Sequence, residues 1–390
     1  MLDFCYYNPA RIVFGRGAEA RTGELVKAHG TKALLHYGGG SVVRTGVLGK
    51  VKASLEAAGV PYVELGGVKP NPRLSLIREG IELCRREGVD FILAVGGGSV
   101  IDSSKAIAAG MCCDGDIWDL YLYPERQPER ALPVGAVLTI PAAGSESSQA
   151  SVVTNEDGWL KRDIAAECLI PRFAVMNPEF TFTLPAYQTA CGASDILAHM
   201  MERYFTRVQH VDLTDRLLEG AMRTILNNAP IALDDPQNYD ARAEIMWTGT
   251  LAHNNLLDTG RVGDWASHEI EHELSGMYDI AHGAGLSIIF PAWMRYVWRD
   301  DPARFVQFAQ RVFDVDLAQS ETEAIVMEMI RRLESWYKRL GLPIRFADAG
   351  LDGSKIEEMA HKCLLHRAST GHFRCLHEED VANIYRLALQ

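Results

Sequence analysis

Four residues in the middle of the chain have side chains that could bind a divalent metal ion. Asp195 and His199 stand four residues apart in a segment with helical periodicity, which places both side chains on one helix face, one turn apart. His268 stands in a second such segment, DWASHEIEHELSG, and His282 follows in the glycine-flanked stretch YDIAHGAG. Three imidazoles and one carboxylate suit a borderline ion such as Zn²⁺ or Fe²⁺. The sequence therefore predicts one metal site from these four residues.

The same region contains a pattern that belongs to another class of metalloenzyme. His268 and His272 fit H-E-x-x-H, in which two histidines bind zinc and the glutamate is the general base of a peptidase. A peptidase would leave Asp195, His199 and the chain's two glycine triplets without a role. We keep the peptidase as an alternative and expect His272 to be a polar group beside the metal, able to pass a proton.

Two glycine triplets, each followed by serine, end apolar runs that are typical of buried strands. One follows KALLHY and the other follows FILAV. Glycines there let backbone N–H groups approach a diphosphate, and the N-terminus of the next helix favours its negative charge. Ser99 and Asp102 also suit the first turn of that helix without any ligand. The residues predicted to hold a dinucleotide at this edge are Gly38, Gly39, Ser41, Gly96, Gly97, Gly98, Ser99 and Asp102.

The end of the first of these strands indicates the kind of dinucleotide. A site for NAD(H) usually carries an acidic residue for the ribose hydroxyls, whereas a 2′-phosphate repels one. This strand end offers glycines and Ser41, with Arg44 close by in the sequence. The sequence therefore favours NADP(H) over NAD(H).

The pattern of apolar residues predicts two domains. Strands alternate with helices as far as about Asn177, which is typical of a doubly wound, mostly parallel sheet. From Thr183 the periodicity is helical almost to the end. We expect an α/β dinucleotide-binding domain over residues 1–180 and an all-helical, metal-binding and catalytic domain over residues 181–390.

Composition and charge exclude several classes of protein. The chain has 390 residues and a formal net charge of -12, so a phosphate-rich partner such as nucleic acid or a membrane surface is not expected. No apolar run is long enough to span a bilayer, and the N-terminus does not resemble a signal peptide. The eight cysteines form no C-x-x-C pair, which fits reduced thiols in the cytoplasm.

Several stretches together resemble the iron-containing (group III) alcohol dehydrogenases over nearly the whole chain. They are GGGSVIDSSKAIA, PAAGSESSQAS, the Asp195 and His199 pair, the His268 and His272 pair, and His282-Gly283. The stretch DWASHEIEHELSGMYDIAHG is similar to the branch of NADPH-dependent butanol dehydrogenases and aldehyde reductases. That branch shares Ala281 in place of the proline that commonly precedes the last ligand. Members that prefer NAD tend to carry Asp at the position of Gly39.

The resemblance implies a dehydroquinate synthase-like fold and a reversible hydride transfer between NADP(H) and a small primary alcohol or aldehyde, such as butanol and butanal. It implies that Asp195, His199, His268 and His282 bind one Fe²⁺ or Zn²⁺. Together with the spacing of the histidines, this gives His272, Asp195 and His268 as the predicted catalytic residues. It places Thr139, Ser145 and Lys161 along the cofactor, and it implies a homodimer.

Besides the peptidase, three alternatives remain open at this stage. A dehydroquinate synthase-like lyase would need Lys or Arg side chains near the histidines for an acidic substrate, and Arg261 is the main candidate. A glycerol dehydrogenase-like enzyme would act on another polyol or on a sugar-like substrate. A scaffold or binding protein could have kept the fold without the chemistry, although the intact set of ligands argues against it.

Overall fold

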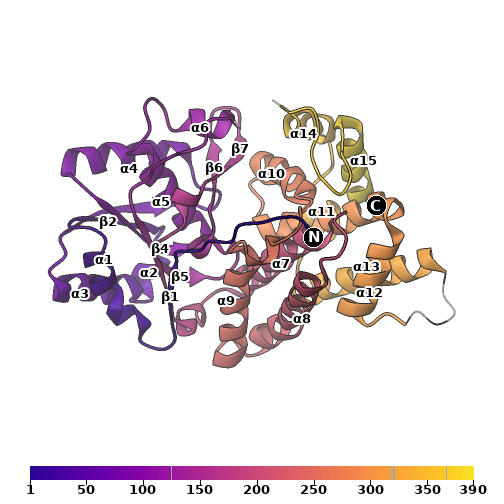
Figure 1. Ribbon diagram of the computed structural model, residues 1–390, viewed down its shortest axis with the longest axis horizontal. Helices are drawn as coiled ribbons and strands as arrows, with labels where there is room; N and C mark the ends of the chain where they lie inside the picture. Colours follow the sequence, from indigo (N-terminus) through magenta and orange to yellow (C-terminus); the bar gives the residue numbers. More distant parts are fainter. Residues whose placement is uncertain (124, 317, 319–320, 366) are drawn as a thin grey trace. The chain divides into compact units, whose positions relative to one another are not determined.

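A computed structural model describes residues 1–123, 125–316, 318, 321–365 and 367–390 (Figure 1). The chain divides into two compact units. The α/β unit comprises Tyr7–Leu184 and Pro236–Asn254, and the helical unit comprises Met1–Tyr6, Pro185–Asp235 and Asn255–Gln390. That residues 1–180 bind the dinucleotide and residues 181–390 bind the metal stays a prediction.

A six-stranded sheet forms the centre of the α/β unit, in the order β1-β8-β5-β4-β2-β3. Every neighbouring pair is parallel, which confirms the predicted sheet type. Its strands are β1 (Arg11–Phe14), β2 (Ala33–Gly38), β3 (Tyr62–Val68), β4 (Phe91–Gly97), β5 (Val134–Ile140) and β8 (Phe173–Met176).

Helices cover both faces of this sheet because successive strand side chains point to opposite sides. Leu35 and Leu93 are buried in one apolar cluster with residues of α1 and α3. Leu34 and Ile92 are buried in another with residues of α4 and α5. Burial on both faces explains the continuous apolar runs that mark these strands in the sequence. The helices of this unit are α1 (Thr22–Lys27), α2 (Ser41–Arg44), α3 (Val47–Ala58), α4 (Leu74–Glu87), α5 (Gly98–Gly110), α6 (Trp118–Leu122) and α9 (Tyr239–His253).

A two-stranded hairpin was not predicted from the sequence. Strands β6 (Ala150–Asn155) and β7 (Leu160–Ala165) pair antiparallel, with Thr154 opposite Lys161. The small polar residues before β6 resemble a loop, and the alternation of apolar and polar residues within the strand is too weak to mark it.

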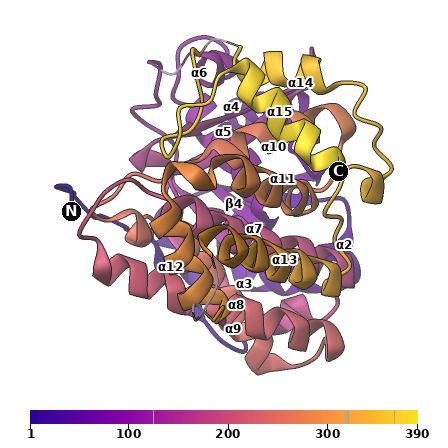
Figure 2. The same ribbon diagram turned by 90° about the vertical axis from the view of Figure 1, so that its right-hand side faces the viewer.

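The helical unit is built around one apolar helix, α11 (His282–Val297). Helix α11 packs against α7, α10, α13 and α15, so its surface is covered on several sides (Figure 2). The remaining helices of the unit are α7 (Ala186–Tyr204), α8 (Asp212–Asp234), α10 (Ala266–Tyr278), α12 (Pro302–Phe313), α13 (Thr322–Arg339), α14 (Ile356–Cys363) and α15 (Glu378–Leu389). Among the described residues, no helix has the length and apolar character that crossing a bilayer would require.

Candidate functional site

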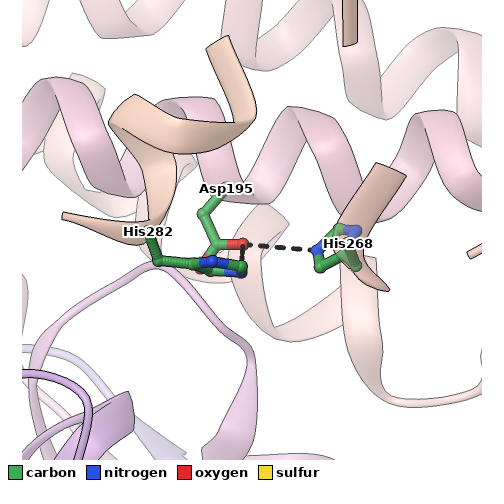
Figure 3. A group of neighbouring side chains, drawn as sticks. All are labelled: Asp195, His268 and His282. Carbon is green, nitrogen blue, oxygen red and sulfur yellow. Dashed lines mark ion pairs between the residues drawn. The ribbon is translucent and has the colours of Figure 1, made fainter. Parts of the chain in front are cut away.

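Three helices of the helical unit bring Asp195, His268 and His282 together. Asp195 lies on α7, His268 on α10, and His282 is the first residue of α11 (Figure 3). One potential ligand atom from each residue lies within 4.8 Å of the others. Asp195 Oδ1 is 3.7 Å from His268 Nε2 and 3.7 Å from His282 Nε2.

His199 approaches the same carboxylate from its own helix. Its Nδ1 lies 3.6 Å from Asp195 Oδ1, and its ring stacks on that of His268 with a centroid distance of 4.7 Å. All four residues predicted as ligands are therefore neighbours of one carboxylate. His272 lies beside them: its ring centroid is 5.7 Å from that of His282.

The donor set fits a divalent metal ion. Within the described part of the chain, Asp195 Oδ1 and His268 Nε2 are buried and have no hydrogen-bond partner. A buried polar atom without a partner is costly, so the pair requires an explanation such as a bound ion. Bonds of about 2.1 Å in a tetrahedron put neighbouring ligand atoms about 3.4 Å apart. The observed separations of 3.6 and 3.7 Å are close to that value.

Two buried glutamates that sequence reasoning missed hold two of the histidines. Glu202 on α7 accepts hydrogen bonds from His268 Nδ1 at 2.8 Å and from the His268 backbone N–H at 2.9 Å. Glu271 on α10 accepts from His282 Nδ1 and from the Ser275 hydroxyl. In both rings this leaves Nε2 as the nitrogen nearest to Asp195.

A sequence signal for these glutamates does exist. Asp195, His199 and Glu202 stand at positions i, i+4 and i+7 of α7. On α10, His268, Glu271, His272 and Ser275 stand at positions i, i+3, i+4 and i+7. Each set forms a polar stripe at helical period on an otherwise buried helix, and such a stripe marks a polar face inside the fold.

The carboxylates determine the protonation of the metal-free site. Burial alone would lower the pKa of His268, but the carboxylates of Asp195 and Glu202 outweigh it and raise the pKa to about 9. The same carboxylates would attract a divalent cation in place of the proton.

Gly283 allows α11 to begin close to α7. A β-carbon at this position would lie 2.0 Å from the carbonyl oxygen of Cys191. The Ser194 hydroxyl donates a hydrogen bond of 2.6 Å to the Gly283 carbonyl. These contacts fix the start of α11, and with it His282, near Asp195.

The two glycine triplets lie at the carboxyl ends of two neighbouring strands of the parallel sheet. Strand β2 ends at Gly38 and β4 ends at Gly97, and the two strands pair side by side. The chain continues from β2 to β3 on one side and from β4 to β5 on the other. The triplets therefore flank the point where the strand order reverses, which is where such sheets bind ligands.

The remaining predicted cofactor residues lie in the same unit. Ser145 Oγ donates a hydrogen bond of 2.5 Å to Asp102 Oδ1 and accepts one of 3.0 Å from Lys105 Nζ. Thr139 is buried near the end of β5, and Lys161 is buried on β7. Ser41 begins α2, and Gly98 and Ser99 begin α5.

Lys105 was not predicted, and it fixes the loop that carries Ser145. Its ammonium also donates to the carbonyls of Ser148 and Ala150, at 2.9 and 2.8 Å. Burial lowers its pKa to about 8, against the opposing effects of Asp102 and Glu146. The signal in the sequence is the pair of charged residues, Asp102 and Lys105, one turn apart in an apolar helix.

Comparison with known proteins gives a consistent result. Residues 9–178 match the sequence profile described as iron-containing alcohol dehydrogenase, and residues 189–389 match that of the C-terminal part of the Fe-containing alcohol dehydrogenase family. The probable NADH-dependent butanol dehydrogenase 1 of Bacillus subtilis is 42% identical over 100% of both chains. The NADPH-dependent aldehyde reductase YqhD of Escherichia coli is 36% identical over 93% of both. The crystal structure of NADH-dependent butanol dehydrogenase A from Thermotoga maritima superposes with a TM-score of 0.96, at 41% identity, over 100% of this chain and 99% of that one.

The parallel sheet with glycine-rich strand ends and the cluster of metal-ligand residues define a metal- and nicotinamide-dependent oxidoreductase. The chain belongs to the iron-containing alcohol dehydrogenase family. The expected fold class and enzyme class are thereby confirmed. Arg261, which a lyase site would have needed, is instead ion-paired inside the helical unit with Asp215 at 2.8 Å.

Proposed function

We propose that this enzyme transfers hydride reversibly between NADP(H) and a small primary alcohol or aldehyde, with one Fe²⁺ or Zn²⁺ held by Asp195, His199, His268 and His282. The observation that supports it most directly is the approach of three imidazoles to Asp195 Oδ1, which is buried and without a hydrogen-bond partner among the described residues. The printed names of the relatives, butanol dehydrogenases and an aldehyde reductase, support the substrate class.

The residues of the helical unit would perform three tasks. Asp195 supplies a negative charge that attracts the cation, and Glu202 and Glu271 hold His268 and His282 through Nδ1. When bound, the metal supplies a Lewis acid for the substrate oxygen and the dinucleotide supplies the hydride. His272, next to His282, would carry the proton that the product oxygen gains or loses.

The residues of the α/β unit would hold the dinucleotide. We place the diphosphate at the N-terminus of α5, where Gly98 and Ser99 are partly exposed and the helix favours negative charge. Gly96 and Gly97 are buried before it, and a β-carbon on either would collide with Val100 or Ile140. Asp102 and Ser99 would act at that same helix start. Thr139, Ser145 and Lys161 would lie along the cofactor, with Lys161 supplying a positive charge for its phosphates or ribose.

Position 39 supports NADP(H) as the cofactor. A β-carbon at Gly39 would meet no atom within 4 Å, so the position has room for a ligand group or for a larger side chain. Gly38, Gly39 and Ser41 place no carboxylate where a 2′-phosphate would lie. The butanol dehydrogenases at 38–42% identity are named NADH-dependent, and the aldehyde reductase at 36% is named NADPH-dependent, so assays with both dinucleotides test this preference.

We also propose that the enzyme acts as a cytoplasmic homodimer. The resemblance to the family supports the dimer, as do the exposed apolar side chains near the N-terminus, Phe4 and Tyr7 among them. Light scattering of the purified protein and fractionation of cells test the two parts.

The experiment that tests the function is an assay with butanal after anaerobic purification. We expect about one metal ion per chain, oxidation of NADPH faster than of NADH, and loss of activity on chelation with recovery when metal is restored. Faster oxidation of NADH would refute the cofactor preference and leave the dehydrogenase intact. Metal-bound protein without activity on any of several aldehydes would refute the substrate class.

A further inference from the structure

Glu271 is a fully buried carboxylate beside the proposed ligands, and one of its oxygens lies within 4.8 Å of ring nitrogens of His272 and His282. It has no exposed surface, and its two oxygens accept hydrogen bonds from Ser275 Oγ and from His282 Nδ1. Burying a carboxylate is costly unless hydrogen bonds or charges compensate it. The two hydrogen bonds, one of them from His282, compensate part of that cost.

Gly285 on α11 creates the space that Glu271 occupies. A β-carbon at position 285 would lie 2.3 Å from Glu271 Oε1 and 2.7 Å from Glu271 Cγ. Gly285 lies inside α11, where glycine is unfavourable relative to alanine. Glycine at position 285 therefore leaves space for the Glu271 side chain, although it does not favour the helix.

Imidazole chemistry connects this carboxylate to the metal site. A neutral histidine carries its proton on one ring nitrogen and a lone pair on the other. A carboxylate that accepts from Nδ1 keeps the proton there and leaves the lone pair on Nε2. In His282, Nε2 is the nitrogen that faces Asp195 at 3.7 Å.

We propose that Glu271, in the space left by Gly285, is a positioning residue that holds His282 in the tautomer and orientation needed for metal binding. Glu202 does the same for His268, through the hydrogen bond of 2.8 Å to Nδ1. This inference rests on the proposed function, because it takes His282 and His268 as ligands. It adds two glutamates and a glycine to the residues that determine the affinity for the metal.

The first test is the affinity of the purified, metal-stripped full-length protein for Co²⁺ and Zn²⁺, measured by competition with a chelator. Glu271→Gln keeps the size of the side chain, but its amide can donate to Nδ1 and so favour a proton on Nε2. We expect it to weaken metal binding by about 10- to 100-fold. The visible spectrum of bound Co²⁺ should change as well, because the geometry of the ligands changes.

Glu269→Gln is the matched control. Glu269 lies on the same helix, two residues away, and its carboxylate pairs with Arg367 at 2.8 Å. The substitution removes the same charge as Glu271→Gln but does not change a residue that contacts His282. The metal affinity should therefore stay within about twofold of wild type, and the Co²⁺ spectrum should not change. An equal loss in both variants would overturn the positioning role in favour of a general charge effect.

A double-mutant cycle tests the role of Gly285. Gly285→Ala should weaken metal binding in the wild-type background because the methyl group displaces Glu271. In the Glu271→Ala background it should have no further effect, because the atoms that it would meet are gone. Additive losses would overturn the link between the two residues.

The outcomes separate this inference from the function on which it rests. Wild-type affinity in Glu271→Gln, together with loss of metal in His268→Ala, would overturn the positioning role and leave the metal site standing. A wild-type protein that binds no Co²⁺ or Zn²⁺ would overturn both. Far-ultraviolet circular dichroism and denaturant unfolding of each variant show whether a loss of metal binding follows from a loss of the fold.

Discussion

Asp195 Oδ1 lies 3.7 Å from Nε2 of His268, and neither atom has a hydrogen-bond partner among the residues that the structure describes. Burying a carboxylate oxygen and an imidazole nitrogen this close together is costly unless a positive charge, from a proton or a metal ion, lies near both. In the metal-free protein that charge comes from the proton on His268, whose pKa the carboxylates of Asp195 and Glu202 raise to about 9, in spite of burial. A metal ion and this proton therefore compete for one place.

The affinity for metal should consequently depend on pH. Below pH 9 the metal has to displace one proton from His268, so the apparent affinity for Zn²⁺ should rise about tenfold per pH unit between pH 7 and 9 and level off above it. Competition with a chelator at each pH measures this. An affinity that does not change over this range would contradict the proton competition.

The stability of the metal-free protein gives the same prediction a second readout. The pKa of His268 is about 9 in the folded protein and 6.5 in its ordinary state. Protonation of His268 therefore stabilises the folded protein fully below pH 6.5, and this contribution is lost as the pH rises through 9. The free energy of unfolding should fall over that window in the metal-free protein. His268→Gln should remove most of this dependence.

The histidines one turn apart on α10 should differ in their effects. His268→Ala removes a predicted ligand and should abolish both metal binding and activity. His272→Ala removes only a predicted proton carrier, so metal content should stay at wild-type level while kcat falls on the order of 100-fold. Metal analysis and steady-state kinetics of both variants decide the matter. Loss of metal from the His272→Ala variant would show that His272 is itself a ligand.

Gly283→Ala should damage the helical unit. The new methyl group would meet the Cys191 carbonyl at 2.0 Å, so α11 must move away from α7. We expect a loss of about 1–3 kcal/mol in the free energy of unfolding, together with weaker metal binding. Gly220→Ala on α8 is the control, because a β-carbon there meets no atom within 4 Å. It should stabilise the protein by about 0.5–1 kcal/mol in the same denaturant titration.

Gly39→Asp should reverse the proposed cofactor preference. The carboxylate fits the open space at this position and would repel a 2′-phosphate while accepting hydrogen bonds from a ribose. We expect the KM for NADPH to rise on the order of tenfold, which corresponds to about 1.4 kcal/mol, with a much smaller change for NADH. Gly39→Asn separates charge from size, since it should have little effect on the ratio. Equal changes for both dinucleotides would contradict the placement of the 2′-phosphate.

Lys105→Met should loosen the loop that carries Ser145. The substitution leaves the carbonyls of Ser148 and Ala150 without their donor, and we expect a loss on the order of 2–4 kcal/mol in stability. The KM for the dinucleotide should rise more than the KM for the aldehyde. Lys52→Met, which removes a surface lysine paired with Glu64, is the control and should have little effect.

Sequence reasoning predicted those parts of the molecule that local patterns determine. The strands β2, β4 and β5 are buried on both faces and are therefore continuous apolar runs, and the glycine triplets end two of them. The i, i+4 spacing of Asp195 and His199 placed both on one helix face. The parallel sheet and the helical second half followed from these patterns and are confirmed.

The parts that were missed depend on contacts between different elements. Glu202 bonds a histidine on α10, and Glu271 bonds one on α11, so neither partner could be assigned from spacing within a helix. Lys105 meets a loop more than forty residues away in the chain. The β6–β7 hairpin is short and partly polar, so its alternation does not stand out from a loop.

All the predicted metal ligands lie in the helical unit, and all the predicted dinucleotide residues lie in the α/β unit. Changes at Gly39 and changes at Glu271 therefore involve separate cores and separate hydrogen-bond networks, and their effects on stability should add. Selection in the laboratory for another dinucleotide could proceed without loss of the metal, and selection for another metal could proceed without loss of the dinucleotide. On the proposed assignment, the residues that bind the metal and those that bind the dinucleotide could therefore be changed separately.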